Sequence, residues 1–381
     1  MNMKGKRNPL VDLGGMGQSP WLDYIHRGLI ASGELARLVA ADGIKGVTSN
    51  PTIFEKAITG GPEYDDQIQA LASGGASVLE AYTEIATEDI RRAADALRPV
   101  YDETSGADGY VSLEVDPDLA YDAQKTVSRA EELFKKVSGQ NVLIKIPATS
   151  EGIPAIEKAV SIGIPVNVTL IFSVNRYEEV AEAYIRGVEK LIASGGNPRS
   201  VASVASFFVS RVDTAVDKLL EETILRWPGS PRAETAISLM GKTAVANARV
   251  AYSRFEAVFS TARWRELAAK GARVQRPLWA STGTKNPKYP DVKYVEELIG
   301  PFTVNTMPPQ TMDAFRDHGT VYDTLSGREA EARAVLSDLG LLDIGLEDVC
   351  GKLTRDGVQS FLDSFRKLLT AIERRLSASV A

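Results

Sequence analysis

Lys145 lies within a short apolar segment, Asn141 to Thr149, whose sequence is NVLIKIPAT. If this segment forms a strand, its side chains alternate, so Lys145 shares one face with Leu143 while the other apolar side chains take the opposite face. Removal from water lowers the pKa of a lysine, and a lysine that is partly neutral near pH 7 can form a Schiff base with a carbonyl compound. A solvated lysine on an edge strand is the structural alternative. The recurrence of similar segments along the chain favours the chemical role.

Asp23 and Glu114 lie near the ends of two other apolar segments, WLDYI and YVSLEV. Schiff-base chemistry needs an amine nucleophile and a proton shuttle that expels water from the carbinolamine, and carbon–carbon cleavage also needs a base for the substrate hydroxyl. Lys145 and the two carboxylates match these three roles. Three further polar residues are candidates for holding hydroxyl groups or a catalytic water: Asn50, Asn167 and Thr169.

Each of these residues also has a structural alternative. Glu114 can form a plain salt bridge with Lys145, and Asp23 can cap a helix, although its place within an apolar segment weakens that interpretation. Asn50 precedes Pro51, a typical first residue of a helix, so capping and substrate binding are equally supported by its spacing.

Eight short segments with strand composition alternate with helical patterns, which predicts βα units around a parallel sheet. The expected strands are Trp21–Ile25, Gly46–Asn50, Tyr110–Val115, Val142–Ile146, Val166–Phe172, Ser203–Phe207, Pro277–Ser281 and Thr303–Met307. Helices are expected near Leu35–Ala41, Glu63–Leu71, Ser77–Leu97, Ala123–Val137, Ile153–Ile162 and Arg176–Ala193. Since right-handed βα units close naturally at eight, the sequence predicts an α/β fold, a (β/α)8 TIM barrel. An open doubly wound sheet is disfavoured because no G-x-G-x-x-G follows the first strand.

We expect one domain over residues 1–381, with the barrel at about 19–318 and a C-terminal helical extension at about 319–381. In the extension, Glu329–Leu339 and Val358–Leu376 have amphipathic helical spacing, which predicts a cap packed on the barrel. The apolar positions of the second helix are Phe361, Leu362, Phe365, Leu368, Leu369 and Ile372.

Polar residues gather at the carboxyl ends of the predicted strands, the end where barrel enzymes keep their active sites. The set is Asp23, Thr48, Asn50, Ser112, Glu114, Lys145, Asn167, Thr169, Ser206, Ser281 and Asn305. Where the alternation is clean, the polar set shares one face, which we expect to point into the barrel lumen. Buried charges bring no reliable stability, so a convergent set that contains Asp, Glu and Lys favours function over structure.

The composition excludes several other classes of protein. The chain has 381 residues, of which 44% are hydrophobic and 25% charged, and its net charge is -6 with a pI of about 5.3. Without a basic run, we expect no nucleic-acid partner and no anionic-membrane surface. Cys350 is the single cysteine, and two histidines, His26 and His318, leave no zinc-ligand cluster, so no metal is expected. Residues 1–18 lack the apolar core of an export signal and no apolar stretch is long enough to span a bilayer, so a cytoplasmic protein is expected.

Several motifs make the chain similar to a known family. The segments GVTSNPTIFEKAI, VSLEVDPDLAYDAQKTV, NVLIKIPATSEGIPAIE, IPVNVTLIFS and ASFFVSRVD resemble the transaldolase family, in the bacterial branch with sequences like RPLWASTGTKNP and GPFTVNTMPPQT. The resemblance runs from about Trp21 to Phe315. It implies a class I, cofactor-free aldolase barrel of the pentose phosphate pathway. Such an enzyme transfers a dihydroxyacetone unit from sedoheptulose 7-phosphate to glyceraldehyde 3-phosphate, giving erythrose 4-phosphate and fructose 6-phosphate.

The resemblance also assigns roles to individual residues. It implies that Lys145 forms the Schiff base, that Asp23 is the acid–base aspartate, and that Glu114 works through a water oriented by Thr169. The residues implied to hold the substrate hydroxyls or its phosphate are Asn50, Asn167, Ser206 and Arg211. Many relatives carry a second phosphate arginine in a short A-S-x-R pattern after the seventh strand. Here that place reads Ala280-Ser281-Thr282-Gly283-Thr284-Lys285, which makes Ser281 and Lys285 the substitutes.

Three rival functions remain at this point. A fructose-6-phosphate aldolase-like enzyme shares the barrel and the lysine but is expected to carry tyrosine where this chain has Phe208, which favours transfer. A phosphate-binding isomerase has no use for a strand lysine between carboxylates. A sugar-phosphate-binding barrel without turnover would have lost Lys145, Asp23 or Glu114. The sequence is compatible with either a monomer or a homodimer.

Overall fold

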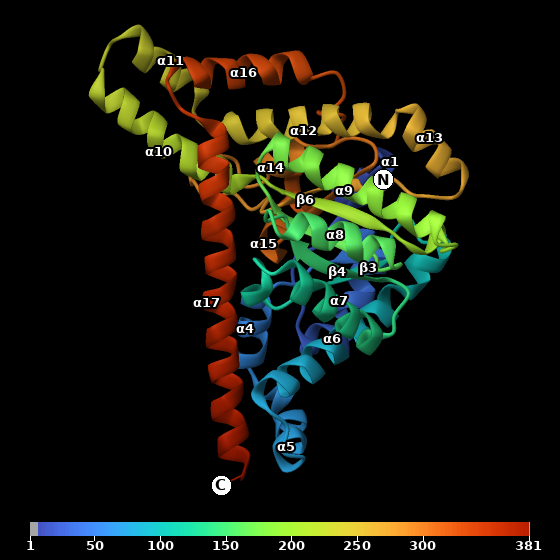
Figure 1. Cartoon of the computed structure of the whole chain (residues 1–381). Coiled ribbons are helices and arrows are strands. Elements are labelled where there is room, and N and C mark those ends of the chain that lie inside the picture. The colour runs from blue at the N-terminus through green and yellow to red at the C-terminus, as the bar shows by residue number, and fades with distance from the viewer. Residues whose placement is uncertain (1–6, 381) are drawn as a thin grey trace, which may run out of the picture.

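The computed structural model describes residues 7–380 and forms a closed barrel of eight parallel strands in sequence order (Figure 1). The strands are β1 (Gln18–Leu22), β2 (Gly46–Val47), β3 (Tyr110–Glu114), β4 (Val142–Pro147), β5 (Val166–Ile171), β6 (Ser203–Phe208), β7 (Arg276–Ala280) and β8 (Thr303–Met307). β1 pairs with β8 from Gln18↔Thr303 to Leu22↔Met307, which closes the barrel. The predicted TIM barrel is therefore confirmed. The expectation for residues 1–18 falls partly on residues 1–6, which lie outside the described part.

Helices cover the outside of the barrel and extend it at one end (Figure 1). They are α1 (Pro9–Gly15), α2 (Arg27–Ala31), α3 (Glu34–Asp42), α4 (Pro51–Thr59), α5 (Asp65–Ser73), α6 (Val78–Glu103), α7 (Ala123–Val137), α8 (Gly152–Ser161), α9 (Val174–Ala193), α10 (Ser210–Arg226), α11 (Pro231–Leu239), α12 (Thr243–Phe259), α13 (Ala262–Ala269), α14 (Lys293–Glu296), α15 (Pro309–His318), α16 (Glu329–Leu341) and α17 (Leu346–Val380). In the part of the chain that the structure describes, no helix is long and apolar enough to cross a membrane.

Two strand predictions are wrong in their bounds by more than one residue. β1 begins three residues earlier than Trp21 and ends at Leu22, because Gln18, Ser19 and Pro20 pair with β8. A proline within this segment hid the strand, since proline donates no ladder hydrogen bond. β2 is only Gly46–Val47, because the chain turns into the cap of α4 soon afterwards.

The placement of Asn305 in the lumen is also wrong. On β8, Thr306 lines the cavity at the carboxyl end of the barrel, so the alternating side chain of Asn305 faces the helices. Asn305 pairs in register with Trp279 of β7, and it is fully buried. The prediction rested on the polar residue type alone. A shift of one residue in register exchanges the two faces of a strand, and the residue type does not give the register.

α17 is the longest helix in the described residues, with 35 residues, and runs along one side of the barrel beside α4 and α10 (Figure 1). It begins twelve residues before the expected Val358. Its predicted apolar positions Phe361, Phe365, Leu368 and Ile372 are buried, while Leu362 and Leu369 are half-buried. The apolar face of this helix therefore packs against α4 and α6, while α16 packs against α12 and α11.

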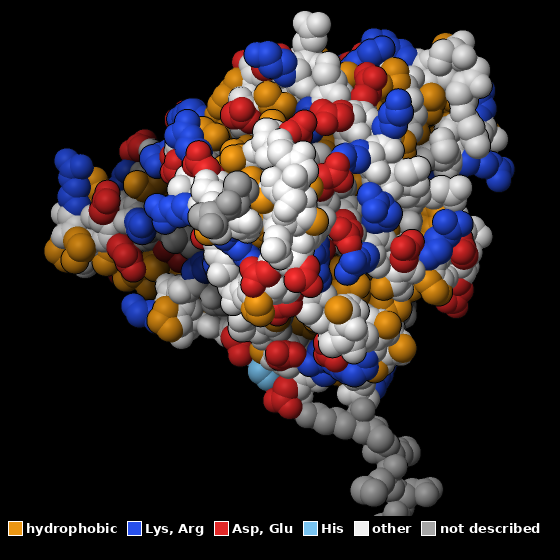
Figure 2. Space-filling view, turned by 90° about the horizontal axis from the view of Figure 1, so that it is seen from below, with side chains coloured by type: hydrophobic (Ala, Val, Ile, Leu, Met, Phe, Trp, Pro, Cys, Tyr) orange, Lys and Arg blue, Asp and Glu red, His pale blue; other side chains and the backbone are white. Residues whose placement is uncertain are grey.

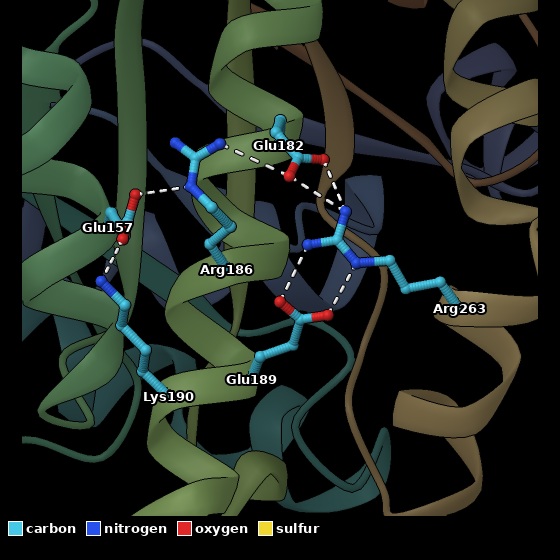
Figure 3. Close-up of polar contacts among 6 residues, drawn as sticks. All are labelled: Glu157, Glu182, Arg186, Glu189, Lys190 and Arg263. Carbon is cyan, nitrogen blue, oxygen red and sulfur yellow. Dashed lines mark hydrogen bonds and ion pairs between the residues drawn. The ribbon is translucent and has the colours of Figure 1, made fainter.

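Ion pairs tie together three helices on the outside of the barrel (Figure 3). Glu157 of α8 accepts from Arg186 and Lys190 of α9, at 2.7 and 2.5 Å. Arg263 of α13 donates two hydrogen bonds to the carboxylate of Glu189 on α9, at 2.6 and 2.8 Å. On the face drawn in Figure 2, basic and acidic side chains are interspersed with scattered hydrophobic ones.

Candidate active site

A cavity of about 140 Å³ lies at the carboxyl ends of the strands. Its wall contains seven of the ten residues predicted for the site: Asp23, Asn50, Lys145, Ser206, Arg211, Ser281 and Lys285. The other three, Glu114, Asn167 and Thr169, lie in the buried layer behind it. Larger hollows lie at the amino ends of the strands and beside α17, but their walls do not contain Lys145.

Lys145 and Glu114 are neighbours across β3 and β4, whose register pairs them directly. The Lys145 Nζ lies 3.4 Å from Glu114 Oε2 and donates to the carbonyl oxygen of Ser49 at 3.1 Å. Only 4% of Lys145 and 6% of Glu114 is exposed. Burial raises the pKa of Glu114 to about 7, although the nearby Lys145 charge acts in the opposite direction. This carboxyl can therefore give or take a proton near neutral pH.

Asp23 is the first residue after β1, where its backbone N–H donates to the carbonyl of Met307 at 2.8 Å. Its Oδ1 accepts from the Thr48 hydroxyl at 2.6 Å, and that hydroxyl also lies 2.7 Å from the hydroxyl of Thr306. Burial raises the pKa of Asp23, while the charge of Lys145 opposes the shift. The capping alternative for Asp23 is wrong, because His26 caps the helix that follows.

Asn50 caps a helix and also lies in the wall of the cavity. Its Oδ1 accepts from the backbone N–H of Ile53 at 3.0 Å and so caps α4, which starts with Pro51. The residue also forms part of the cavity wall. Because the cap uses the oxygen, the side-chain amide nitrogen is the group it offers to a ligand.

Ser206, Asn167 and Ser112 form a chain of hydrogen bonds across the lumen. Ser206 Oγ donates to Asn167 Oδ1 at 2.7 Å, and Asn167 Nδ2 donates to Ser112 Oγ at 2.9 Å. Asn167 is thus held by its neighbours behind Ser206. Thr169 Oγ1 differs, because it is buried and has no hydrogen-bond partner among the described residues, while the neighbour of Glu114 Oε2 is Lys145 Nζ at 3.4 Å.

Arg211 is the second residue of α10, and its guanidinium lies 5.3 Å from the ring centroid of Phe208. Burial lowers the pKa of Arg211, and the negative charge of Asp23 opposes that effect. Asp213, two residues farther along α10, accepts from the backbone N–H of Ala244 at 2.7 Å and from the Tyr294 hydroxyl at 2.9 Å, so an ion pair between Arg211 and Asp213, which their spacing in the sequence would allow, is not formed.

The loop after β7 brings Ser281 and Lys285 to the same wall. Ser281 has a left-handed backbone, with φ of 55°, and its hydroxyl lies 3.0 Å from that of Ser210 at the start of α10. Farther along, the Tyr289 hydroxyl donates to Asp217 Oδ2 at 2.7 Å, which attaches the loop to α10 a second time. The longer loop therefore places Lys285 beside Arg211.

Sequence reasoning missed Phe361 of α17, which lines the cavity although it lies far beyond the barrel in the chain. Its ring centroid is 5.7 Å from Lys145 Nζ, and 4% of the residue is exposed. Helical spacing had identified it as apolar and buried, but the same signal applies to Phe365 and Leu368, so nothing in the pattern singled it out.

Comparisons with known proteins agree over nearly the whole chain. The profile of a family described as "Transaldolase/Fructose-6-phosphate aldolase" matches residues 20–372, well beyond the expected limit at Phe315. Similar proteins named "Transaldolase" include one from Parafrankia sp. (strain EAN1pec), 50% identical with 98% of this chain and 99% of that protein covered. Another is from Thermobifida fusca, 50% identical with coverage of 97% and 99%. One from Mycobacterium bovis is 47% identical, with 98% and 99% covered.

Proposed function

This chain belongs to the transaldolase/fructose-6-phosphate aldolase family, and we propose that it transfers a dihydroxyacetone unit from sedoheptulose 7-phosphate to glyceraldehyde 3-phosphate. The products are erythrose 4-phosphate and fructose 6-phosphate, and the reaction belongs in the cytoplasm. The observation that carries this proposal is the buried Lys145 in contact with Glu114, in a cavity that also contains Asp23. One contiguous apolar core that includes β-strand and α17 residues supports a single domain over the chain.

In the proposed reaction, the amine of Lys145 attacks the ketose carbonyl. Glu114 passes a proton through a water held by Thr169, so that the carbinolamine oxygen leaves as water. Thr169 Oγ1 supports this water position, because it is buried, has no hydrogen-bond partner among the described residues and so needs one. Asp23 then takes the C4 hydroxyl proton as the C3–C4 bond breaks and the protonated Schiff base accepts the electron pair. The aldose leaves, and the three-carbon enamine stays on Lys145.

The substrate's polar groups have candidate partners in the same cavity. Asn50 and Ser206 lie in the cavity wall, where they can bind the hydroxyl groups of the dihydroxyacetone unit. Asn167 orients Ser206 through its hydrogen bond. Arg211 and Lys285 supply the positive charge for the phosphate, beside Ser281. A guanidinium can grip a phosphate through two hydrogen bonds, whereas an ammonium acts as a point charge.

A transfer assay tests the proposal. The purified protein is incubated with fructose 6-phosphate and erythrose 4-phosphate, and sedoheptulose 7-phosphate is measured. We expect transfer by the wild type, none by Lys145→Arg, and full activity for Lys135→Arg, whose lysine is exposed on α7. Free dihydroxyacetone as the main wild-type product would instead favour the aldolase-like alternative, against which Phe208 in the cavity wall already argues.

A further inference from the structure

Phe361 forms the part of the active-site wall that does not come from the barrel. It lies on α17, shares the cavity with Lys145 and Asp23, and is almost fully buried. Its ring centroid is 5.7 Å from the nitrogen that would carry the substrate. An apolar ring at this distance takes the place of water molecules on one side of Lys145.

α17 is held closely on both sides of Phe361. One turn before it, Gly357 packs against Leu170 so tightly that an added Cβ would lie 2.8 Å from Leu170 Cδ2. Leu170 has a left-handed φ of 60° at the register shift of β5, next to Thr169. After Phe361, the Ser364 hydroxyl lies 2.8 Å from that of Thr52 on α4. These contacts fix the position of α17, and with it the position of the Phe361 ring relative to Lys145.

A bound enamine has two possible fates. In transfer, its nucleophilic carbon forms a bond with the acceptor aldehyde carbon, and the aldehyde oxygen takes a proton. In the side reaction that carbon takes a proton instead, which gives the iminium of dihydroxyacetone. Water then adds to the iminium carbon, its oxygen becomes the ketone oxygen, and the carbon–nitrogen bond breaks to return the free lysine. The ketose formed by transfer leaves Lys145 through the same hydrolysis of its iminium, so the step that separates the two fates is transfer of a proton from a water molecule to the enamine carbon, and access of water to that carbon decides between transfer and release.

We propose that Phe361 is a specificity-determining residue that keeps water from the enamine on Lys145, so that the three-carbon unit waits for an acceptor aldehyde. This inference rests on the proposed transaldolase function. It assigns to α17 a role in the choice of reaction in addition to its packing on the barrel.

Two rates test the inference: the release of free dihydroxyacetone from fructose 6-phosphate without acceptor, and the formation of sedoheptulose 7-phosphate with erythrose 4-phosphate. Their ratio does not depend on the amount of folded enzyme. For Phe361→Ala we expect the ratio of release to transfer to rise by roughly tenfold or more, because water replaces the ring. For Phe361→Leu, which keeps an apolar cover, the ratio should stay near that of the wild type. If Phe361→Ala does not fold, Phe361→Val should give an intermediate rise.

Phe365→Ala is the matched control. Phe365 lies one turn farther along α17 and packs edge-on against Tyr82, with ring centroids 5.2 Å apart, rather than over Lys145. Its loss should lower stability and leave the ratio unchanged. An unchanged ratio in Phe361→Ala or Phe361→Val, an equal rise in Phe361→Leu, or an equal rise in Phe365→Ala would each overturn the inference. A wild type that transfers nothing would contradict the proposed function itself, so the two failures are distinguishable.

Discussion

At the scale of single residues, two opposing effects act on the pKa of the carboxyls near Lys145. Burial raises the pKa of both Asp23 and Glu114, while the lysine charge favours their ionised forms. A cluster that can exchange a proton near pH 7 suits a reaction that needs both an acid and a base.

The titration of Glu114 should be visible in the pH dependence of the rate of imine formation. Its pKa is raised to about 7, so the protonated acid that assists loss of water is present below that pH and is lost above it. We expect the rate of imine formation to fall as the pH rises through about 7. In Glu114→Gln the rate should be lower by on the order of a hundredfold, and this limb of the profile should be absent. The measurement is stopped-flow imine formation from pH 5 to 9. A limb that persisted in Glu114→Gln would assign it to another group.

Arg211 and Lys285 should act on the phosphate group alone. Loss of either, as Arg211→Ala or Lys285→Ala, is expected to raise KM for phosphorylated substrates by roughly tenfold, the scale of a charge-assisted hydrogen bond. Steady-state kinetics with fructose 6-phosphate and with unphosphorylated fructose separates the effects, since only the first should change. Lys270→Ala, an exposed lysine at the end of α13, is the control. An unaltered KM in Lys285→Ala would mean that the second phosphate ligand lies elsewhere.

Residue types indicated which polar residues come together better than they indicated how those residues are arranged. A lysine in an apolar strand and carboxylates at strand ends identified Lys145, Asp23 and Glu114, because such groups are costly to bury without a purpose. Asn305 was misplaced, since alternation alone does not give the register. Phe361 was missed, because an apolar residue in an amphipathic helix has the same pattern whether it touches a ligand or only the core.

At the scale of elements, two tyrosines and Ser281 attach the segment after β7 to α10. Tyr289 and Tyr294 donate to the buried carboxylates of Asp217 and Asp213. α10 starts with the segment that carries Arg211, and the loop carries Lys285. The two tyrosines therefore hold together the two phosphate ligands that we propose.

Tyr289→Phe should loosen this arrangement. The change leaves Asp217 Oδ2 without its donor, which we expect to lower the free energy of unfolding by about 1–3 kcal/mol. KM for fructose 6-phosphate should rise, while activity on unphosphorylated fructose changes little. Chemical denaturation and steady-state kinetics measure the two effects. Tyr121→Phe, at an exposed tyrosine, should change neither. A stability loss without any change in KM would restrict Tyr289 to a structural role.

Elements with strong periodicity were predicted closely. α7 and β8 have the predicted bounds, since Asp122 caps α7 and β8 lies between clear turns. The length of β2 was overestimated, because the residues after Val47 leave the sheet and Asn50 caps α4. α17 was underestimated at its start, where Leu346 to Gly357 carry more polar residues and the packing against the barrel extends the helix.

At the scale of the whole molecule, the buried carboxyls make stability depend on pH. Burial raises the pKa of Asp213 from 3.8 to about 6, so the folded protein holds this proton more tightly than the unfolded chain. The contribution of Asp213 to the free energy of unfolding is therefore full below pH 3.8 and is lost as the pH rises through about 6. Asp213→Asn should remove on the order of 2–3 kcal/mol of the stability difference between pH 4 and pH 7. Urea denaturation of both proteins at the two pH values tests this, and equal differences would contradict it.

The Schiff base on Lys145 is the central claim, and borohydride trapping tests it most directly. The protein is mixed with fructose 6-phosphate, reduced with borohydride, digested and mapped by mass spectrometry. We expect loss of activity together with a reduced dihydroxyacetone adduct on the peptide that contains Lys145, and no adduct in Lys145→Arg. A label on a different lysine, or an active enzyme that takes up no label, would contradict the account.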